Sequence, residues 1–333
     1  MREYRFDVVR VVCMTYLVAF FHLSGYVYPN GLTGVCHSLS MALAHASLGL
    51  FTFVSGYLLG RKYRFGQPES VGVWTFYKKR ILRVFPLFVL ASVALWLIGL
   101  NGARATLNGL LCISPFVNPV PLTMYYIPLI LWCYLVTPLI SRRGWRWRMF
   151  WGISLFVLLV VARILVPSID NRFVFNVFFY LVGIVSAPCF DWEFDSRIGM
   201  VFKASAVLGF VMLMLVMLYG PGLKGTVGQL AMGALGVFVI LFICEAVSNL
   251  LFDNQLNRQH GFKATVCRLV SLVSYASMAC YMFHRFFYWA AEKLWNPADT
   301  TVKWLFMAGI VYPIILVLSY AIQKLYDNAV KRL

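Results

Sequence analysis

Long apolar runs recur along this 333-residue chain, and they constrain its fold more than any other feature. A transmembrane helix needs about 20 mostly apolar residues. We find ten candidate spans, at residues 8–28, 38–60, 84–100, 122–141, 149–167, 173–188, 200–220, 226–250, 269–294 and 302–323. Because lipid offers the backbone no hydrogen-bond partner, such segments must be helical. The sequence therefore predicts an all-α, polytopic membrane helix bundle with about ten transmembrane helices, formed by a single domain over residues 1–333.

The composition agrees with a membrane protein. Hydrophobic residues make up 61% of the chain and charged residues only 12%, which leaves too little polar surface for a water-soluble domain. The net charge of +17 would suit a nucleic-acid-binding protein, but the Lys and Arg residues lie between the apolar runs and not along one polar face. We therefore expect membrane lipid, and not nucleic acid, among the partners of this chain.

The positions of the cations also predict the orientation. Cytoplasmic loops are enriched in Lys and Arg, and most of the 29 fall in inner segments when the N-terminus is placed in the cytoplasm. An even number of spans then returns the C-terminus to the cytoplasm. The first run is long enough to span and lacks a small-residue cleavage site, so we interpret it as a helix and not as a signal peptide. The compact chain without lumenal domains suggests a bacterial inner (cytoplasmic) membrane.

The first apolar run, Val8 to Tyr28, encloses His22. An ionisable ring inside a membrane is costly, so it is a functional candidate by default. A neutral imidazole can act as a general base that removes a hydroxyl proton, and action as a nucleophile that forms a covalent intermediate is a second possibility. The structural alternative is a buried imidazole that hydrogen-bonds to a neighbouring helix.

Two further histidines and one arginine could face one outward-opening cavity together with His22. At 1.5 Å per residue, His22 lies roughly 10 Å below the outer end of its span, and His45 lies at a similar depth. His284 falls in the outer half of its own span, and Arg285 beside it could stabilise an oxyanion or bind an acidic sugar. The alternative for each is a structural hydrogen bond within the bundle.

We predict no metal site. No pair of these histidines has the i, i+4 spacing of a helical ligand pair, and no carboxylate accompanies them. The eight cysteines are scattered without a CxxC pair, and most sit in apolar segments as small buried hydrophobes.

The segment Arg61 to Arg83 is the most basic part of the chain. Its aromatic and basic residues suggest a short helix lying at the membrane interface. The cations Lys78, Lys79, Arg80 and Arg83 end this segment, and Arg80 and Arg83 share one helical face at i, i+3. Two guanidinium groups so placed could clamp a phosphorylated cytosolic substrate. The alternative is an anchor attracted to anionic lipids.

Five segments, in this order, resemble the acyltransferase-3 family of membrane acyltransferases. They are Phe6-Asp7-Val8-Val9-Arg10 leading to Phe21-His22, Phe51-Thr52-Phe53-Val54-Ser55-Gly56-Tyr57-Leu58-Leu59, Phe76-Tyr77-Lys78-Lys79-Arg80-Ile81-Leu82-Arg83-Val84-Phe85-Pro86, Tyr125-Tyr126 through Tyr134 to Pro138, and Ser274-Tyr275 through Tyr281 to His284. The resemblance covers essentially the whole chain, including ten spans and a cytoplasmic N-terminus.

The resemblance implies acyl transfer, usually of acetyl, from cytosolic acyl-CoA to a hydroxyl or amine. The acceptor would commonly be a cell-surface glycan or its lipid-linked precursor. By the same resemblance, His22 is catalytic, Arg10 is its paired N-terminal arginine, and the cations of the basic segment, Arg80 with Arg83 above all, meet the CoA. Acetyl-CoA would be a co-substrate, and no tightly bound cofactor is expected.

One spacing departs from the family pattern. The family usually has ten residues between the arginine and the histidine, whereas Val11 to Phe21 makes eleven. At about 100° per residue, the extra one turns His22 away from the expected helix face. A π-bulge, a feature often found at functional sites, would absorb it.

The competing class is a transporter or flippase of a glycan or small metabolite. Many transporters have two related halves with interrupted spans at matching positions, and the chain shows no convincing internal repeat. A catalytically silent scaffold would need neither an intramembrane histidine nor a concentrated basic loop. We therefore predict a membrane acyltransferase in which acyl-CoA enters from the cytoplasm and the acceptor from outside.

Overall fold

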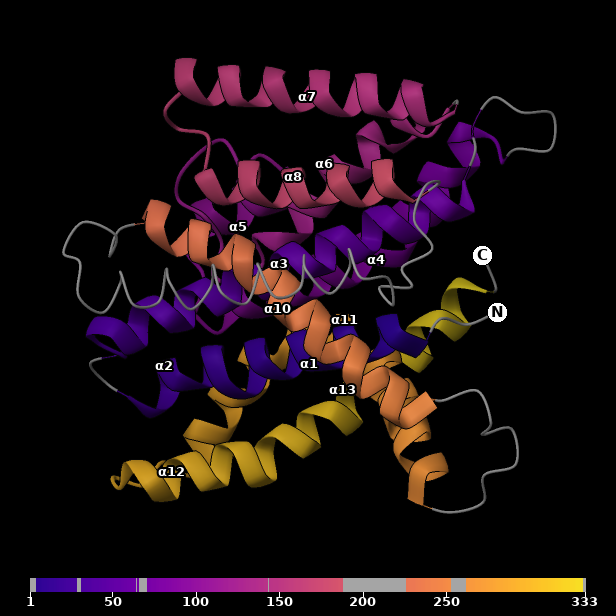
Figure 1. Cartoon of the computed structure of the whole chain (residues 1–333). Coiled ribbons are helices and arrows are strands. Elements are labelled where there is room, and N and C mark those ends of the chain that lie inside the picture. Colours follow the sequence, from indigo (N-terminus) through magenta and orange to yellow (C-terminus); the bar gives the residue numbers. More distant parts are fainter. Residues whose placement is uncertain are drawn as a thin grey trace. The chain divides into compact units, whose positions relative to one another are not determined.

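The computed structural model of the chain describes residues 4–28, 31–63, 65, 71–142, 144–187, 226–252 and 262–331. This part of the chain is helical and contains no strand (Figure 1). Its elements are α1 (Tyr4–Tyr16), η1 (Leu17–His22), α2 (Leu23–Val27), α3 (Gly34–Lys62), α4 (Val73–Leu97), α5 (Ala103–Leu110), α6 (Tyr126–Ile140), α7 (Trp145–Leu165), α8 (Asn171–Ser186), α10 (Thr226–Phe252), α11 (Phe262–Leu294), α12 (Thr300–Phe306), η3 (Met307–Val311) and α13 (Tyr312–Val330).

Seven helical segments in this part of the chain are long and apolar enough to cross a membrane. They are Arg5–Val27, Cys36–Lys62, Val73–Leu97, Trp145–Leu165, Gly228–Ser248, Ala264–Leu294 and Thr300–Val330. Two shorter apolar helices, Tyr126–Ile140 and Asn171–Ser186, coincide with the predicted runs at 122–141 and 173–188. The run at 200–220 lies outside the described residues. The all-α membrane fold is confirmed, and the total of ten spans and the cytoplasmic termini stay predictions.

The basic segment corrects one expectation. Its last residues do not form a separate interfacial helix, because Val73–Leu97 is one continuous helix that carries the third apolar run. Pro86 lies inside this helix without ending it, as is tolerated when neighbouring groups satisfy the freed carbonyl in a membrane. The basic residues are therefore the first turns of a spanning helix.

The chain divides into two compact units. The first comprises Met1–Ser47 and Asp195–Leu333, and the second comprises Leu48–Phe194, so the boundary falls within α3. In the first unit, α11 contacts both α1 and α13, and α1 also contacts α10. The face of the first span that carries Val9, Cys13 and Leu17, spaced by four residues, is buried in this packing. The single domain expected from the sequence stays a prediction.

In the second unit, α3 and α8 touch through their backbones. A Cβ atom at Gly56 would lie 2.3 Å from the carbonyl oxygen of Tyr180, and one at Gly183 would lie 2.3 Å from that of Phe53. Membrane helices associate through such small residues because lipid provides no hydrophobic drive for their packing. The two glycines therefore set how closely these helices pack.

Replacing Gly183 by alanine is expected to destabilise the protein, because the new methyl group meets backbone atoms that cannot rotate away. Overpacking of this kind costs about 1–3 kcal/mol. Thermal unfolding in nanodiscs would show a lower melting temperature. The matched control is Gly309→Ala, because nothing lies within 4 Å of that Cβ position. Equal melting temperatures for the two variants would contradict the proposed contact.

A buried arginine joins three helices of the same unit. The side chain of Arg148 on α7 is almost fully enclosed, and its Nη1 donates to the carbonyl oxygens of Gly60 at 2.9 Å and Ile184 at 3.2 Å. Both acceptors lie in the last turns of their helices, α3 and α8. A cation there complements the helix dipoles and the unpaired terminal carbonyls. Arg148 therefore has a structural role in addition to any influence on topology.

Candidate active site

His22 lies at the end of a π-helical turn. The first span is α-helical to Tyr16, π-helical from Leu17 to His22, and α-helical again to Val27. A π turn accommodates one residue more than an α turn. The structure thus contains the bulge that the eleven-residue spacing from Arg10 called for, at the residues that lead directly into His22.

His22 pairs with His284 of α11. Nδ1 of His22 lies 2.9 Å from Nε2 of His284, and the two ring centroids are 4.8 Å apart with an interplanar angle of 17°. His22 is 7% exposed and His284 is fully buried. The structure therefore brings together two of the three histidines that the sequence places at similar depth.

The partners of His284 define where the protons of the pair reside. Nδ1 of His284 lies 2.8 Å from the carbonyl oxygen of Tyr281 and 3.2 Å from that of Cys280. Carbonyl oxygens only accept, so this Nδ1 carries a proton. In a neutral ring, Nε2 of His284 then accepts, and Nδ1 of His22 must donate to it. Nε2 of His22 is left with a lone pair.

Two tyrosines support this arrangement. The hydroxyl of Tyr288 donates to the carbonyl oxygen of Val18 within the π turn at 3.3 Å, and its ring lies edge-on to His284. The ring of Tyr281 lies near both histidines, with centroids 6.5 Å from His22 and 6.1 Å from His284. These aromatic contacts restrict the rotation of both imidazoles.

Arg285 follows His284 and is half-buried. Its guanidinium lies 5.8 Å from the ring centroid of Tyr26, whose hydroxyl donates to the Arg285 carbonyl oxygen at 3.2 Å. Among the described residues, its buried Nε has no hydrogen-bond partner. A buried donor without an acceptor is costly. It is therefore available to an acceptor that the described residues do not supply.

The four cations proposed for CoA lie in the first turns of α4, in the second unit. Arg80 is half-buried, donates to the hydroxyl of Tyr63 at 3.3 Å, and has its guanidinium 5.7 Å from the rings of Tyr63 and Phe76 and 5.8 Å from that of Tyr134. The other three, Lys78, Lys79 and Arg83, are exposed. Arg80 and Arg83 therefore occupy different environments.

The comparison with known families decides the identity. A family model described as an acyltransferase domain, that of the acyltransferase-3 family, matches residues 3–324. The chain belongs to the acyltransferase-3 family. No curated protein and no solved structure matches the chain. Membership in the acyltransferase-3 family and the seven apolar helices indicate a multi-pass integral membrane acyltransferase.

The arginine that the acyltransferase-3 resemblance pairs with His22 lies away from it. The helical path from Arg10 to His22 rises roughly 18 Å at 1.5 Å per residue. The guanidinium of Arg10 instead lies 3.6 Å from the carboxylate of Asp7, which also accepts from the hydroxyl of Ser274 on α11 at 2.6 Å. This ion pair lies near the start of the first span, and the pairing of Arg10 with His22 stays a prediction.

The third histidine, His45, is buried on α3 and packs against α10. A Cβ atom at Gly233 would lie 3.0 Å from the Cβ of His45. The described residues contain no cluster of three or more His, Cys, Asp or Glu side chains placed to hold a metal ion. The described contacts of His45 thus place it in a helix-packing interface.

Sequence reasoning missed Asp7, Tyr288 and the direct bond between the two histidines. Asp7 is only 4% exposed, and a carboxylate at the start of an apolar run is itself a signal that it pairs with another helix. Tyr288 carried no such signal, since tyrosine is common near membrane interfaces. The histidine bond depends on the rotation of two helices, which depth alone does not define.

Proposed function

We propose that this membrane acyltransferase moves an acetyl group from cytosolic acetyl-CoA to a hydroxyl of a glycan or lipid-linked sugar, with His22 as general base. The observation that carries the proposal is the hydrogen bond between Nδ1 of His22 and Nε2 of His284. Because the carbonyl oxygens beside Nδ1 of His284 require a proton there, this bond in the neutral pair leaves Nε2 of His22 with a lone pair. A neutral imidazole with one nitrogen held as donor and the other free is suited to accept a hydroxyl proton.

In the proposed step, the acceptor hydroxyl donates to Nε2 of His22 and its oxygen attacks the thioester carbonyl. The C–O bond forms as the proton moves to the imidazole, and the C–S bond then breaks. The departing thiolate takes that proton, so the products are the ester and free CoA. The imidazolium formed in between keeps its Nδ1–H bond to His284, which strengthens when charged.

The carbonyl oxygen gains negative charge during this attack, and Arg285 is the proposed donor for it. Its Nε is buried and lacks a hydrogen-bond partner among the described residues. A donor positioned before the reaction stabilises the developing oxyanion without a reorganisation cost. Arg285 would therefore be a catalytic residue beside the base.

Arg80, with Lys78, Lys79 and Arg83, is the proposed site for the phosphates of CoA. The three rings around Arg80 hold its guanidinium in place, and Arg is the side chain best suited to forked phosphate recognition. The exposed neighbours add positive charge that attracts the anionic donor.

Replacing Arg80 by methionine is expected to raise KM for acetyl-CoA by roughly 10-fold or more, because a hydrogen bond to a charged group contributes about 1.5–3 kcal/mol. Steady-state kinetics in nanodiscs would show this with kcat nearly unchanged. Arg104→Met on α5 is the matched control, since Arg104 is exposed and outside the proposed site. An unchanged KM for Arg80→Met would refute this assignment.

The activity itself is tested with the purified protein in nanodiscs, acetyl-CoA and a pool of glycan acceptors. We expect CoA release that depends on the acceptor and an acetyl ester, cleaved by mild alkali, on the product. Transport of a glycan across the membrane without any turnover of acetyl-CoA would favour a transporter and overturn the proposal.

A further inference from the structure

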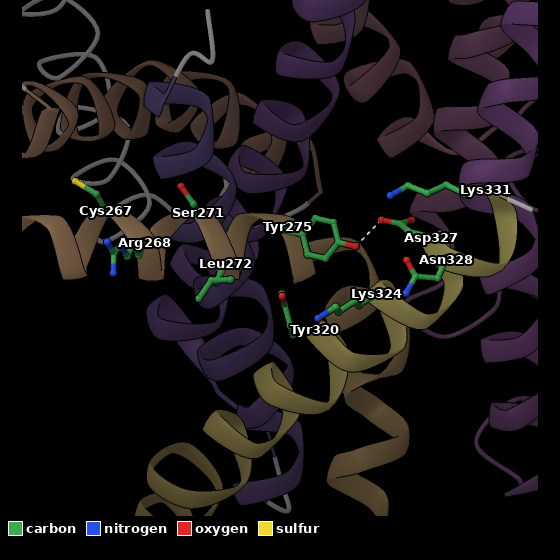
Figure 2. A pocket seen from close by; sticks show the side chains of 10 residues that line it. All are labelled: Cys267, Arg268, Ser271, Leu272, Tyr275, Tyr320, Lys324, Asp327, Asn328 and Lys331. Atoms are coloured by element: carbon green, nitrogen blue, oxygen red, sulfur yellow. Dashed lines mark hydrogen bonds between the residues drawn. The ribbon is translucent and has the colours of Figure 1, made fainter. Parts of the chain in front are cut away.

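A cavity of about 680 Å³ lies between α11 and α13 in the first unit (Figure 2). Its lining includes neither His22 nor His284. On α11 it is lined by Arg268, Ser271 and Tyr275, which recur on one helical face. On α13 it is lined by Tyr320, Lys324 and Asp327, which also share a face, and Lys331 follows directly after the helix. Two helices thus turn polar faces toward one another at the ends that the charge distribution predicts to be cytoplasmic.

The lining carries more positive than negative charge. Arg268, Lys324 and Lys331 face a single acid, Asp327. Among the described residues, no ion pair involves any of these three cations. The described lining therefore carries an excess of two positive charges.

The one acid is already engaged by neutral groups. The hydroxyl of Tyr275 donates to Oδ2 of Asp327, as Figure 2 shows, and Nε2 of Gln323 donates to Oδ1 at 2.9 Å. These bonds hold the carboxylate against the wall between the two helices. The bond from Tyr275 joins α11 to α13, whereas Gln323 lies on the same helix as Asp327.

Two aromatic rings also line the cavity. The rings of Tyr275 and Tyr320 meet edge to face at 5.6 Å, and the ammonium of Lys324 lies 5.9 Å from the Tyr320 ring. The lining residue Leu272 is 45% exposed, and its neighbour Leu269 is 54% exposed. The cavity thus places its cations beside exposed leucines of α11, a helix that is apolar enough to span a membrane.

We propose that this cavity binds the phosphate group of an anionic ligand, with Arg268, Lys324 and Lys331 as its charge partners. Basic pockets between transmembrane helices on the cytoplasmic side suit anionic headgroups, and the exposed leucines favour a phospholipid as the source. A soluble phosphate would use the same three cations. The hydroxyl of Tyr320, which also lines the cavity, can donate a further hydrogen bond to a phosphate oxygen.

The test is binding of dioctanoyl phosphatidylglycerol to the delipidated full chain in neutral detergent, followed by native mass spectrometry. Dioctanoyl phosphatidylcholine and inorganic phosphate form the comparison arms. Each of Arg268→Gln, Lys324→Gln and Lys331→Gln is expected to weaken binding about 5-fold, since a cation near an anionic headgroup contributes about 1 kcal/mol. Lys293→Gln, at the exposed far end of the same helix, is the matched control and should bind like wild type.

The comparison of the two lipids with inorganic phosphate distinguishes a lipid headgroup from a soluble phosphate as the ligand. Preference for phosphatidylglycerol over phosphatidylcholine, lost in the Gln variants, supports a lipid headgroup. Displacement of the lipid by inorganic phosphate at millimolar concentration supports a soluble phosphate in the same cavity. Equal binding of both lipids, or equal losses in Lys293→Gln and the cavity variants, would overturn the proposal.

A second measurement does not depend on folding of the variants. Cys267 lines the cavity, whereas the exposed Cys36 does not, and both side chains are thiols that maleimide can label. In the wild-type protein, phosphatidylglycerol is expected to slow maleimide labelling of Cys267 several-fold relative to that of Cys36. Unchanged labelling of both cysteines would count against the cavity as the site.

Discussion

Replacing His22 by glutamine is expected to lower kcat for acetyl transfer by about 10²–10⁴-fold, the usual contribution of a positioned general base. Glutamine keeps a polar side chain of similar reach but offers no nitrogen lone pair. Acetyl-CoA binding should be retained, because the base does not hold the donor. Single-turnover measurements with saturating acceptor would separate the chemical step from binding.

The control for this variant is His37→Gln, which changes an exposed histidine on α3. It should keep the wild-type rate. If His22→Gln also transferred acetyl at the wild-type rate while remaining folded, another residue would have to be the base.

Replacing His284 by leucine is expected to lower kcat by roughly 100-fold, as for other residues that orient a catalytic group. Leucine cannot accept the Nδ1–H of His22, so the proton is free to move to the reactive Nε2. His284→Gln should restore part of the rate, because its amide oxygen can accept that bond. His284 is a positioning residue in this account, since it acts through His22.

A merely structural role for His284 would give a different pattern. ¹⁵N NMR of histidine-labelled protein reports which ring nitrogen carries the proton, and we expect Nδ1–H at His22 in the wild type and a mixture in His284→Leu. A wild-type His22 protonated at Nε2, or equal rates for the leucine and glutamine variants, would rule out the proposed positioning role of His284.

Much of the fold follows from the apolar runs, because hydropathy over about 20 residues reflects the cost of placing a segment in lipid. What the runs do not define is where a helix begins within a polar flank. The predicted interfacial helix was therefore wrong, since the basic residues after Val73 continue into the same helix as the third apolar run. Nothing between them breaks a helix except Pro86, which the helix accommodates.

Part of the candidate site was also predictable from the apolar runs. A histidine inside an apolar run is visible in any sequence, and its depth follows from helical rise. Its partner depends on helix rotation, and the π turn before His22 changes that rotation by an amount set by tertiary packing. Arg148 shows the converse, because a residue that reads as a topology signal is buried between helix ends.

In the proposed mechanism, His22 removes a proton and does not itself carry the acyl group. The most direct measurement mixes purified protein with radiolabelled acetyl-CoA, first without acceptor and then with a glycan acceptor, following free CoA and the label together. A general base predicts no stoichiometric CoA release until the acceptor is added, and then label on the acceptor alone. One equivalent of CoA released before addition, with the label retained on His22, would contradict the account and establish an acyl-histidine intermediate.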